Sequence, residues 1–254
     1  MASNLQLVRS PGSMRERLIL ALDVDDLERV RALVGLLAGE VGMFKVGKQL
    51  FTHAGPPAVK LIQKMGGEVF LDLKFHDIPS TVAKAAIVAT RLGVKMFNVH
   101  ASGSLAMMRQ TVREVRRVCR QEPLRRPIML AVTVLTSLNK RDLEKLGVDG
   151  EVTDQVVRLA LLTLEADMDG VVAAPHEVAE IRAACGRRFI IVSPAIRAQR
   201  GKRNDQRKVM TPKEAVRAGV DYVVVGRPII EAKDPLSVVR EMVSEMERSN
   251  ATAS

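Results

Sequence analysis

Short apolar runs rich in Val, Ile and Leu alternate along the chain with longer stretches in which apolar residues recur every three or four positions. The short runs predict buried strands, and the longer stretches predict amphipathic helices that cover them. Strands are expected over residues 18–24, 42–47, 68–74, 94–100, 128–135, 170–174, 189–193 and 222–225. Each is followed by an expected helix, over residues 25–37, 56–65, 80–92, 105–119, 152–165, 176–184, 212–218 and 236–246. A charged insert, residues 139–145, separates the fifth strand from its helix.

These strand–helix units take up roughly 32 residues each, which favours a single (β/α)8 TIM barrel. A doubly wound open sheet is the alternative fold with the same alternation. No linker rich in Gly, Pro or Ser divides the chain, so one domain is expected. It covers residues 15–248, between a flexible leader at residues 1–14 and a flexible tail at residues 249–254.

The third predicted strand ends in a group of charges, with Asp72 and Lys74 in the strand and Asp77 in the turn beyond it. Side chains alternate between the two faces of a strand, so Asp72 and Lys74 should point the same way. Pro79 then predicts the start of a helix. A structural salt bridge at a strand end is one interpretation of this pattern. Burying charges is costly unless they pair or take part in chemistry, so three charges before a strand-to-helix turn favour a functional site.

Polar residues also stand at the ends of most other predicted strands, whereas the positions before them are apolar. They are Asp23, Lys45, His100, Thr136, Ser137, Ser193, Arg197, Gly226 and Arg227. In a (β/α)8 barrel the carboxyl ends of the strands form the functional face. The sequence therefore predicts that these residues gather around one site.

The end of the last predicted strand has the features of a phosphate-binding turn. Gly226 allows a ligand to approach the backbone, and Pro228 suits the first turn of a short helix whose free N–H groups attract anions. A simple turn is the alternative interpretation. The long basic loop at residues 195–208 is either a solvated loop or a lid that closes over a phosphate.

Composition narrows the classes of function. The chain has 39 Lys and Arg against 29 Asp and Glu, a net charge of +10, but only 3% aromatic residues and no Trp. Few aromatic side chains are thus available to stack on bases, and the basic residues are scattered, which disfavours nucleic-acid binding. No apolar run reaches the roughly 18–20 residues of a membrane span. Without a signal peptide, and with two cysteines expected as free thiols, a cytoplasmic location is expected.

Several segments, taken in order from about residue 17 to the last helix, resemble the orotidine 5′-phosphate decarboxylase family. These segments are residues 20–24, 44–47, 70–79, 98–101, 134–137, 193–197 and 225–229. Taken by itself, the Asp-x-Lys-x-x-Asp core at residues 72–77 does not identify the family, because sugar-phosphate enzymes of the same superfamily share it. The whole ordered set is specific for the family.

The resemblance implies a catalytic array of Asp72, Lys74, Asp77 and Lys45. Lys74 would protonate C6 of the pyrimidine as carbon dioxide leaves, and Asp72 would lie near the departing carboxylate. Asp77 would reach into the site from the partner subunit of a homodimer, and Thr81 from the same crossing segment would touch the ribose. No cofactor and no metal ion are implied.

The resemblance also implies a set of substrate-binding residues, namely Asp23, Lys45, Thr81, Thr136, Arg197, Gln206, Gly226 and Arg227. Asp23 and Lys45 would hold the ribose hydroxyls, and Thr136 would contact the pyrimidine edge. Gln206 and the glycine–arginine pair after the last strand would bind the phosphate, and Arg197 would support the closing loop.

The residue types suit this chemistry. Loss of carbon dioxide from an sp² carbon leaves an electron pair with no adjacent carbonyl to accept it, so a fixed positive charge must stabilise it. A lysine between carboxylates keeps its proton, because opposite charges favour the ammonium form. Two alternatives remain at this point. One is a sugar-phosphate decarboxylase or aldolase in which Asp72 and Asp77 hold Mg²⁺. The other is a non-catalytic nucleic-acid-binding protein, suggested only by the net charge.

Overall fold

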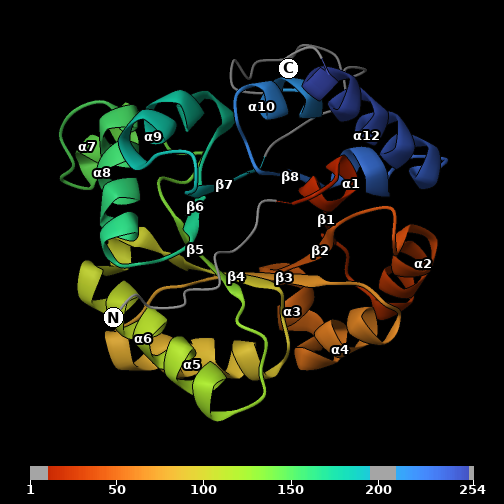
Figure 1. Cartoon of the computed structure of the whole chain (residues 1–254), viewed down its shortest axis with the longest axis horizontal. Helices are drawn as coiled ribbons and strands as arrows, with labels where there is room; N and C mark the ends of the chain where they lie inside the picture. The colour runs from red at the N-terminus through yellow and green to blue at the C-terminus, as the bar shows by residue number, and fades with distance from the viewer. Residues whose placement is uncertain (1–10, 195–209, 252–254) are drawn as a thin grey trace.

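The computed structural model describes residues 11–194 and 210–251 of the chain. Its strands form one closed parallel barrel in the order β1 to β8, because β1 pairs with both β2 and β8 (Figure 1). The strands are β1 (Leu18–Ala21), β2 (Met43–Gly47), β3 (Val69–Phe75), β4 (Met96–His100), β5 (Ile128–Val132), β6 (Gly170–Val172), β7 (Ile190–Ser193) and β8 (Tyr222–Val225). The predicted (β/α)8 barrel is confirmed, and the open sheet is excluded by the pairing of the first and last strands.

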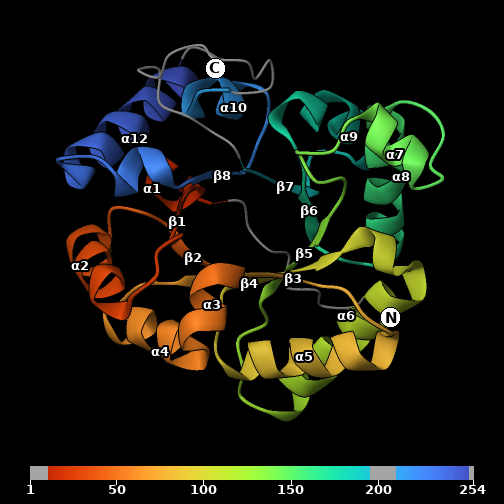
Figure 2. The same ribbon diagram turned by 180° about the vertical axis from the view of Figure 1, so that it is seen from behind.

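The main helices form an outer ring around the strands, as both faces of the molecule show (Figures 1 and 2). They are α2 (Leu27–Leu37), α4 (Pro56–Lys64), α5 (Pro79–Arg91), α6 (Leu105–Gln121), α8 (Val152–Glu165), α9 (Val178–Cys185), α10 (Pro212–Arg217) and α12 (Pro235–Ala251). Shorter helical segments are α1 (Met14–Arg17), α3 (Lys48–Ala54), α7 (Lys140–Lys145), α11 (Arg227–Ile230) and the 3₁₀ turns η1 (Ala101–Gly103) and η2 (Pro175–Glu177). None of the helices within the described ranges has the length and apolar character needed to cross a membrane.

Helix α7 forms where the sequence predicted only a charged insert. Asn139 caps it, since the Asn139 side chain accepts a hydrogen bond from the Asp142 backbone N–H and the Asp142 carboxylate accepts one from the Asn139 N–H. This reciprocal capping box satisfies two backbone donors that a short helix would otherwise leave free.

Two layers of apolar side chains fill the fold. Alternate strand residues point into the barrel, so that Ile19 and Phe70 lie inside it while Leu20 and Leu71 pack outward against the helices. The interior layer consists of Ile19, Ala21, Met43, Phe70, Met96, Ile128, Leu130, Ile190, Val192, Tyr222 and Val224. The barrel centre is therefore a packed core that supports the site at one end of the strands.

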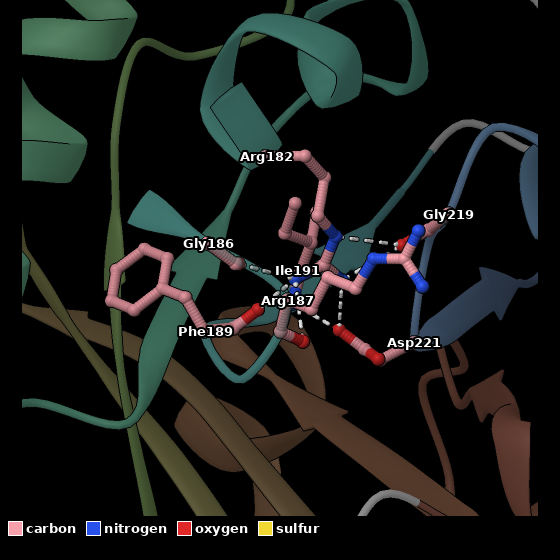
Figure 3. A network of polar contacts seen from close by, with 7 residues as sticks. All are labelled: Arg182, Gly186, Arg187, Phe189, Ile191, Gly219 and Asp221. Carbon is pink, nitrogen blue, oxygen red and sulfur yellow. Dashed lines mark hydrogen bonds and ion pairs between the residues drawn. The ribbon is translucent and has the colours of Figure 1, made fainter. Parts of the chain in front are cut away.

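A largely buried ion pair lies at the opposite end of the barrel, where β7 and β8 begin. The Arg182 guanidinium lies 2.5 Å from Asp221 Oδ2 and donates to the Gly219 carbonyl at 2.8 Å (Figure 3). It also donates to the carbonyl of Phe189, and Asp221 Oδ2 accepts from the Ile191 N–H at 2.8 Å. These contacts tie the loop before β7 to the loop before β8.

The expected domain limits stay predictions. Helix α1 begins at Met14, the last residue of the expected leader, and the α12 backbone continues to Ala251, inside the expected tail. Residues 1–10 and 252–254 lie outside the described residues.

Candidate active site

A cavity of about 190 Å³ opens at the carboxyl ends of the strands. Its polar lining consists of Lys45, Asp72, Lys74 and Thr136. Its apolar lining consists of Phe70, Val132, Val134, Leu135, Val172, Ala173, Pro194 and Val224. A charged group facing apolar walls in one concavity is typical of a small-molecule site.

Four residues that the sequence predicted as site residues form a chain of alternating charges. Lys74 Nζ lies 2.6 Å from Asp72 Oδ1, and Lys45 Nζ lies 3.2 Å from Asp72 Oδ2. Lys45 Nζ also lies 3.3 Å from Asp23 Oδ1. Because β1, β2 and β3 are neighbours in the barrel, residues from three separate parts of the sequence meet at one point.

The prediction that Asp72 and Lys74 share a face holds, but the assumption of a regular strand is wrong. Lys74 has a φ of 53°, in the left-handed region that residues other than glycine seldom adopt. Pairing between β3 and β4 shifts at the same point: Leu71 is opposite Phe97, whereas Phe75 is opposite Val99. The end of β3 is thus a bulge that redirects the Lys74 side chain.

Asn98 on β4 belongs to the site and was not predicted as a site residue. It is fully buried, its Nδ2 donates to Asp72 Oδ1 at 2.7 Å, and its Oδ1 accepts from the Lys74 backbone N–H at 2.8 Å. A polar amide within the apolar run Met96–Val99 was the available signal, because a buried amide needs partners.

Burial and the neighbouring charges shift the pKa of Asp72 in opposite directions. Burial raises the pKa of this carboxyl, but the Lys45 and Lys74 ammonium groups, together with hydrogen bonds from Lys74 and Asn98, outweigh burial. The net result is an Asp72 pKa below its ordinary value. The carboxylate is therefore ionised and faces the cavity at neutral pH.

Two histidines stack beside the array. The rings of His76 and His100 have their centroids 5.3 Å apart, and Ser102 Oγ lies 2.8 Å from His100 Nδ1. Burial, followed by the nearby charges of His76, Lys74 and Lys48, lowers the pKa of His100 to about 4. His100 is consequently neutral at pH 7.

Asp77 and Thr81 lie at the start of α5 and are exposed. Asp77 Oδ1 accepts a hydrogen bond from the backbone N–H of its neighbour Ile78 at 2.6 Å, and the Ile78 side chain is 65% exposed. An exposed carboxylate, an exposed isoleucine and an exposed threonine thus occupy one end of this helix.

Gly226 and Arg227 lie where β8 passes into α11. A Cβ atom at Gly226 would lie 3.4 Å from the Ala21 Cβ and 3.5 Å from Asp23 Oδ2, so the end of β8 is close to the end of β1. Arg227, the first residue of α11, is exposed. Gly226, one of the predicted phosphate residues, therefore lies next to Asp23 of the charge array.

The remaining predicted residues divide into two groups. Thr136 lines the cavity, as expected. Arg197 and Gln206 fall within residues 195–209, outside the described part of the chain. Across the described ranges, no three His, Cys, Asp or Glu side chains gather as ligands for a metal ion would.

A closed (β/α)8 barrel with an array of lysines and aspartates at the carboxyl ends of its strands defines a barrel enzyme, because this is where such barrels carry their chemistry. The family model described as "Orotidine 5′-phosphate decarboxylase / HUMPS family" matches residues 16–242. The chain belongs to this family.

Individual relatives agree with this assignment. The orotidine 5′-phosphate decarboxylase of Syntrophotalea carbinolica is 53% identical over 232 residues, which cover 91% of this chain and 95% of the relative. The protein of the same name from Pelobacter propionicus is 50% identical, with the same coverage of both chains. The crystal structure of orotidine 5′-phosphate decarboxylase from Lactobacillus acidophilus matches with a TM-score of 0.79 and 32% identity, covering 90% of this chain and 98% of that one.

Proposed function

We propose that this chain decarboxylates orotidine 5′-phosphate to uridine 5′-phosphate without a cofactor, with Lys74 as the proton donor. The reaction is the last step of de novo UMP synthesis, which makes the chain an enzyme of pyrimidine biosynthesis and a carboxy-lyase. The observation that carries the proposal is the Lys74 ammonium held 2.6 Å from Asp72 at the cavity wall. Relatives named for this activity share about half of their residues with the chain.

The proposed reaction breaks the bond between C6 and the carboxylate carbon. Carbon dioxide leaves, and the electron pair that stays on C6 takes a proton from Lys74, which regains one from solvent. The Lys74 ammonium stabilises the developing carbanion before it gives up the proton. Asp72, ionised and beside Lys74, lies near the departing carboxylate, and Lys45 bridges Asp72 and Asp23.

The proposed binding residues surround this centre. Asp23 and Lys45 hold the ribose hydroxyls, Thr136 contacts the pyrimidine edge, and Gly226 and Arg227 bind the phosphate. The short distance between Gly226 and Asp23 supports this division, because ribose and phosphate are adjacent in the substrate. We assign Gln206 to the phosphate and Arg197 to the support of the loop that carries it. Binding energy from the remote phosphate then serves to orient the reacting ring.

We propose further that the enzyme is a homodimer in which Asp77 and Thr81 complete the partner's site. Both residues are exposed, and the 65% exposed Ile78 between them and the 55% exposed Val88 on α5 offer apolar area for a second copy. Co-expression of Lys74→Ala and Asp77→Asn chains tests the sharing. In a mixed dimer one site has both changes and the other has neither, so random pairing should restore about one quarter of wild-type activity. No activity above that of the separate variants would contradict a shared site.

The function itself is tested by following the ultraviolet absorbance of orotidine 5′-phosphate with purified protein and no added cofactor. We expect conversion to uridine 5′-phosphate that is unchanged after EDTA treatment, and none with Lys74→Ala. Activity lost to EDTA and restored by Mg²⁺ would favour the sugar-phosphate alternative. An unchanged spectrum with wild-type protein would refute the proposed function.

The cytoplasmic location stays a prediction. The two cysteines, Cys119 and Cys185, are free, which supports a reducing compartment.

A further inference from the structure

We propose that Asn98 is a positioning residue for the decarboxylation: its side-chain amide fixes the Asp72 carboxylate and the Lys74 backbone together, so that the charge array is assembled before substrate binds. This inference rests on the proposed function, since it concerns the same site. Asn98 touches neither the phosphate residues nor the ribose residues in the described contacts, and it acts through Asp72 and Lys74.

Asn98 makes two hydrogen bonds that join Asp72 to the Lys74 backbone. Its Nδ2 donates to Asp72 Oδ1 at 2.7 Å, the same oxygen that lies 2.6 Å from Lys74 Nζ. Its Oδ1 accepts from the Lys74 N–H at 2.8 Å. A carboxamide donates from its nitrogen and accepts at its oxygen without carrying a charge, whereas an ionised carboxylate can only accept. A leucine of similar size can do neither.

The bulge in β3 leaves an irregular backbone at Lys74. Lys74 has a φ of 53°, a conformation that costs free energy in any residue with a Cβ and persists only where its surroundings hold it. Between Leu71 and Phe75 the pairing with β4 is interrupted, and the Asn98 side chain supplies a partner for the Lys74 N–H. The amide therefore compensates for the irregular backbone that aims the Lys74 side chain at the cavity.

The charges around Asp72 also favour a neutral amide at position 98. Asp72 Oδ2 faces Lys45 at 3.2 Å, and Asp72 Oδ1 is shared by Lys74 and Asn98. Every group facing this carboxylate in the described contacts is thus a cation or a neutral donor. A second carboxylate in place of the amide would repel Asp72 when ionised, but could donate a hydrogen bond to it when protonated.

The test compares Asn98→Leu and Asn98→Asp with wild type and with the control Thr163→Val. Thr163 is fully buried on α8, donates to the Leu159 carbonyl at 2.7 Å, and does not line the cavity. We expect Asn98→Leu to lower kcat by about 10- to 100-fold, the loss expected for a hydrogen bond to a charged group, with KM changed by less than about threefold. We expect Thr163→Val to keep kcat within about twofold.

The pH dependence of kcat in Asn98→Asp distinguishes a positioning role from a general loss of packing, because a loss of packing would not change it. The ratio of its kcat to that of wild type should rise as the pH falls, because protonation of the introduced carboxyl group restores a donor to Asp72. A ratio independent of pH would overturn the proposal, as would an Asn98→Leu kcat within twofold of wild type. Should Asn98→Leu not fold, the pH profile of Asn98→Asp decides.

The failure of this proposal is distinguishable from failure of the proposed function. Wild-type protein that does not convert orotidine 5′-phosphate would refute the function alone. A crystal structure of Asn98→Leu then tests the positioning role directly, because we expect Lys74 to leave its left-handed conformation. An unchanged Lys74 backbone and an unchanged Lys74–Asp72 distance would refute the role of Asn98 whatever the activity.

Discussion

Replacing Arg182 with methionine should destabilise the barrel far more than the loss of an ordinary surface ion pair. The Arg182 side chain is 17% exposed and that of Asp221 is 11% exposed, so both charges are largely removed from water. The guanidinium donates to Asp221 and to the backbone carbonyls of residues 186, 187, 189 and 219 (Figure 3). Methionine would preserve much of the side-chain volume while removing all of these donors.

The expected loss of stability follows from the Asp221 charge, which stays buried when Arg182 is replaced. Asp221 would keep its hydrogen bond from the Ile191 N–H, but its charge would be buried without a counter-ion. Removing one partner of a buried pair typically costs about 3–5 kcal/mol, whereas an exposed pair contributes about 0–1 kcal/mol. For a chain of this length, we expect the midpoint of thermal unfolding to fall by roughly 10 °C.

Urea unfolding followed by far-ultraviolet circular dichroism measures the effect. Arg109→Met is the matched control, since Arg109 pairs with Glu165 across side chains that are 55% and 56% exposed. The double variant Arg182→Met/Asp221→Asn should recover part of the lost stability, because no buried charge remains. A free energy of unfolding for Arg182→Met equal to that of the control would refute the reasoning.

Three further predictions concern the site. Lys74→Ala should lower kcat by at least about a thousandfold, because it removes both a general acid and a fixed positive charge, while calorimetry should still detect binding of uridine 5′-phosphate. A near-normal kcat would contradict the assignment of Lys74 as the proton donor. Arg227→Ala should raise KM by about tenfold or more and lower kcat less, because the group that we propose it binds, the phosphate, is remote from the reacting carbon; steady-state kinetics in which only kcat falls would contradict this. The pKa of His100 is lowered to about 4, so the unfolded chain, with an ordinary value of about 6.5, binds the proton first as the pH falls. Wild-type stability should therefore decline between about pH 6.5 and pH 4, and His100→Gln should remove that part of the decline; parallel stability profiles would refute it.

The apolar pattern predicted the strands because a parallel barrel buries both faces of its strands, so each strand is a short apolar run in the sequence. It placed the ends of the first, fifth and sixth strands too late; the fifth strand was expected to reach residue 135 but ends at Val132. Val134 and Leu135 beyond it line the cavity. Apolar character reports burial, and these residues are apolar because they form the wall of a site rather than because they pair with a neighbouring strand.

The part of the site whose residues are close together in the sequence could be predicted. Asp72 and Lys74 are two residues apart, and the sequence correctly predicted that their side chains meet, although a bulge rather than a regular strand orients Lys74. A polar residue within an apolar run marked the position of Asn98, but its partners depend on that bulge and on the register of a neighbouring strand, so its role was missed. Helix α7 was also missed, although its capping residues Asn139 and Asp142 can be recognised in the sequence.

The pairing of β1 with β8 has a consequence for how the enzyme is made. Asp23 follows the first strand, and Gly226 follows the last, yet a side chain on the glycine would touch the aspartate. During synthesis on the ribosome, the contacts among β1, β2 and β3 become available early, whereas the β8 side of the pocket must wait until nearly the whole chain has emerged. A nascent chain that lacks β8 therefore contains the residues of the acid–lysine array but not the residue pair after β8 that we propose binds the phosphate, and the two sides of the pocket meet only when the ring of strands closes.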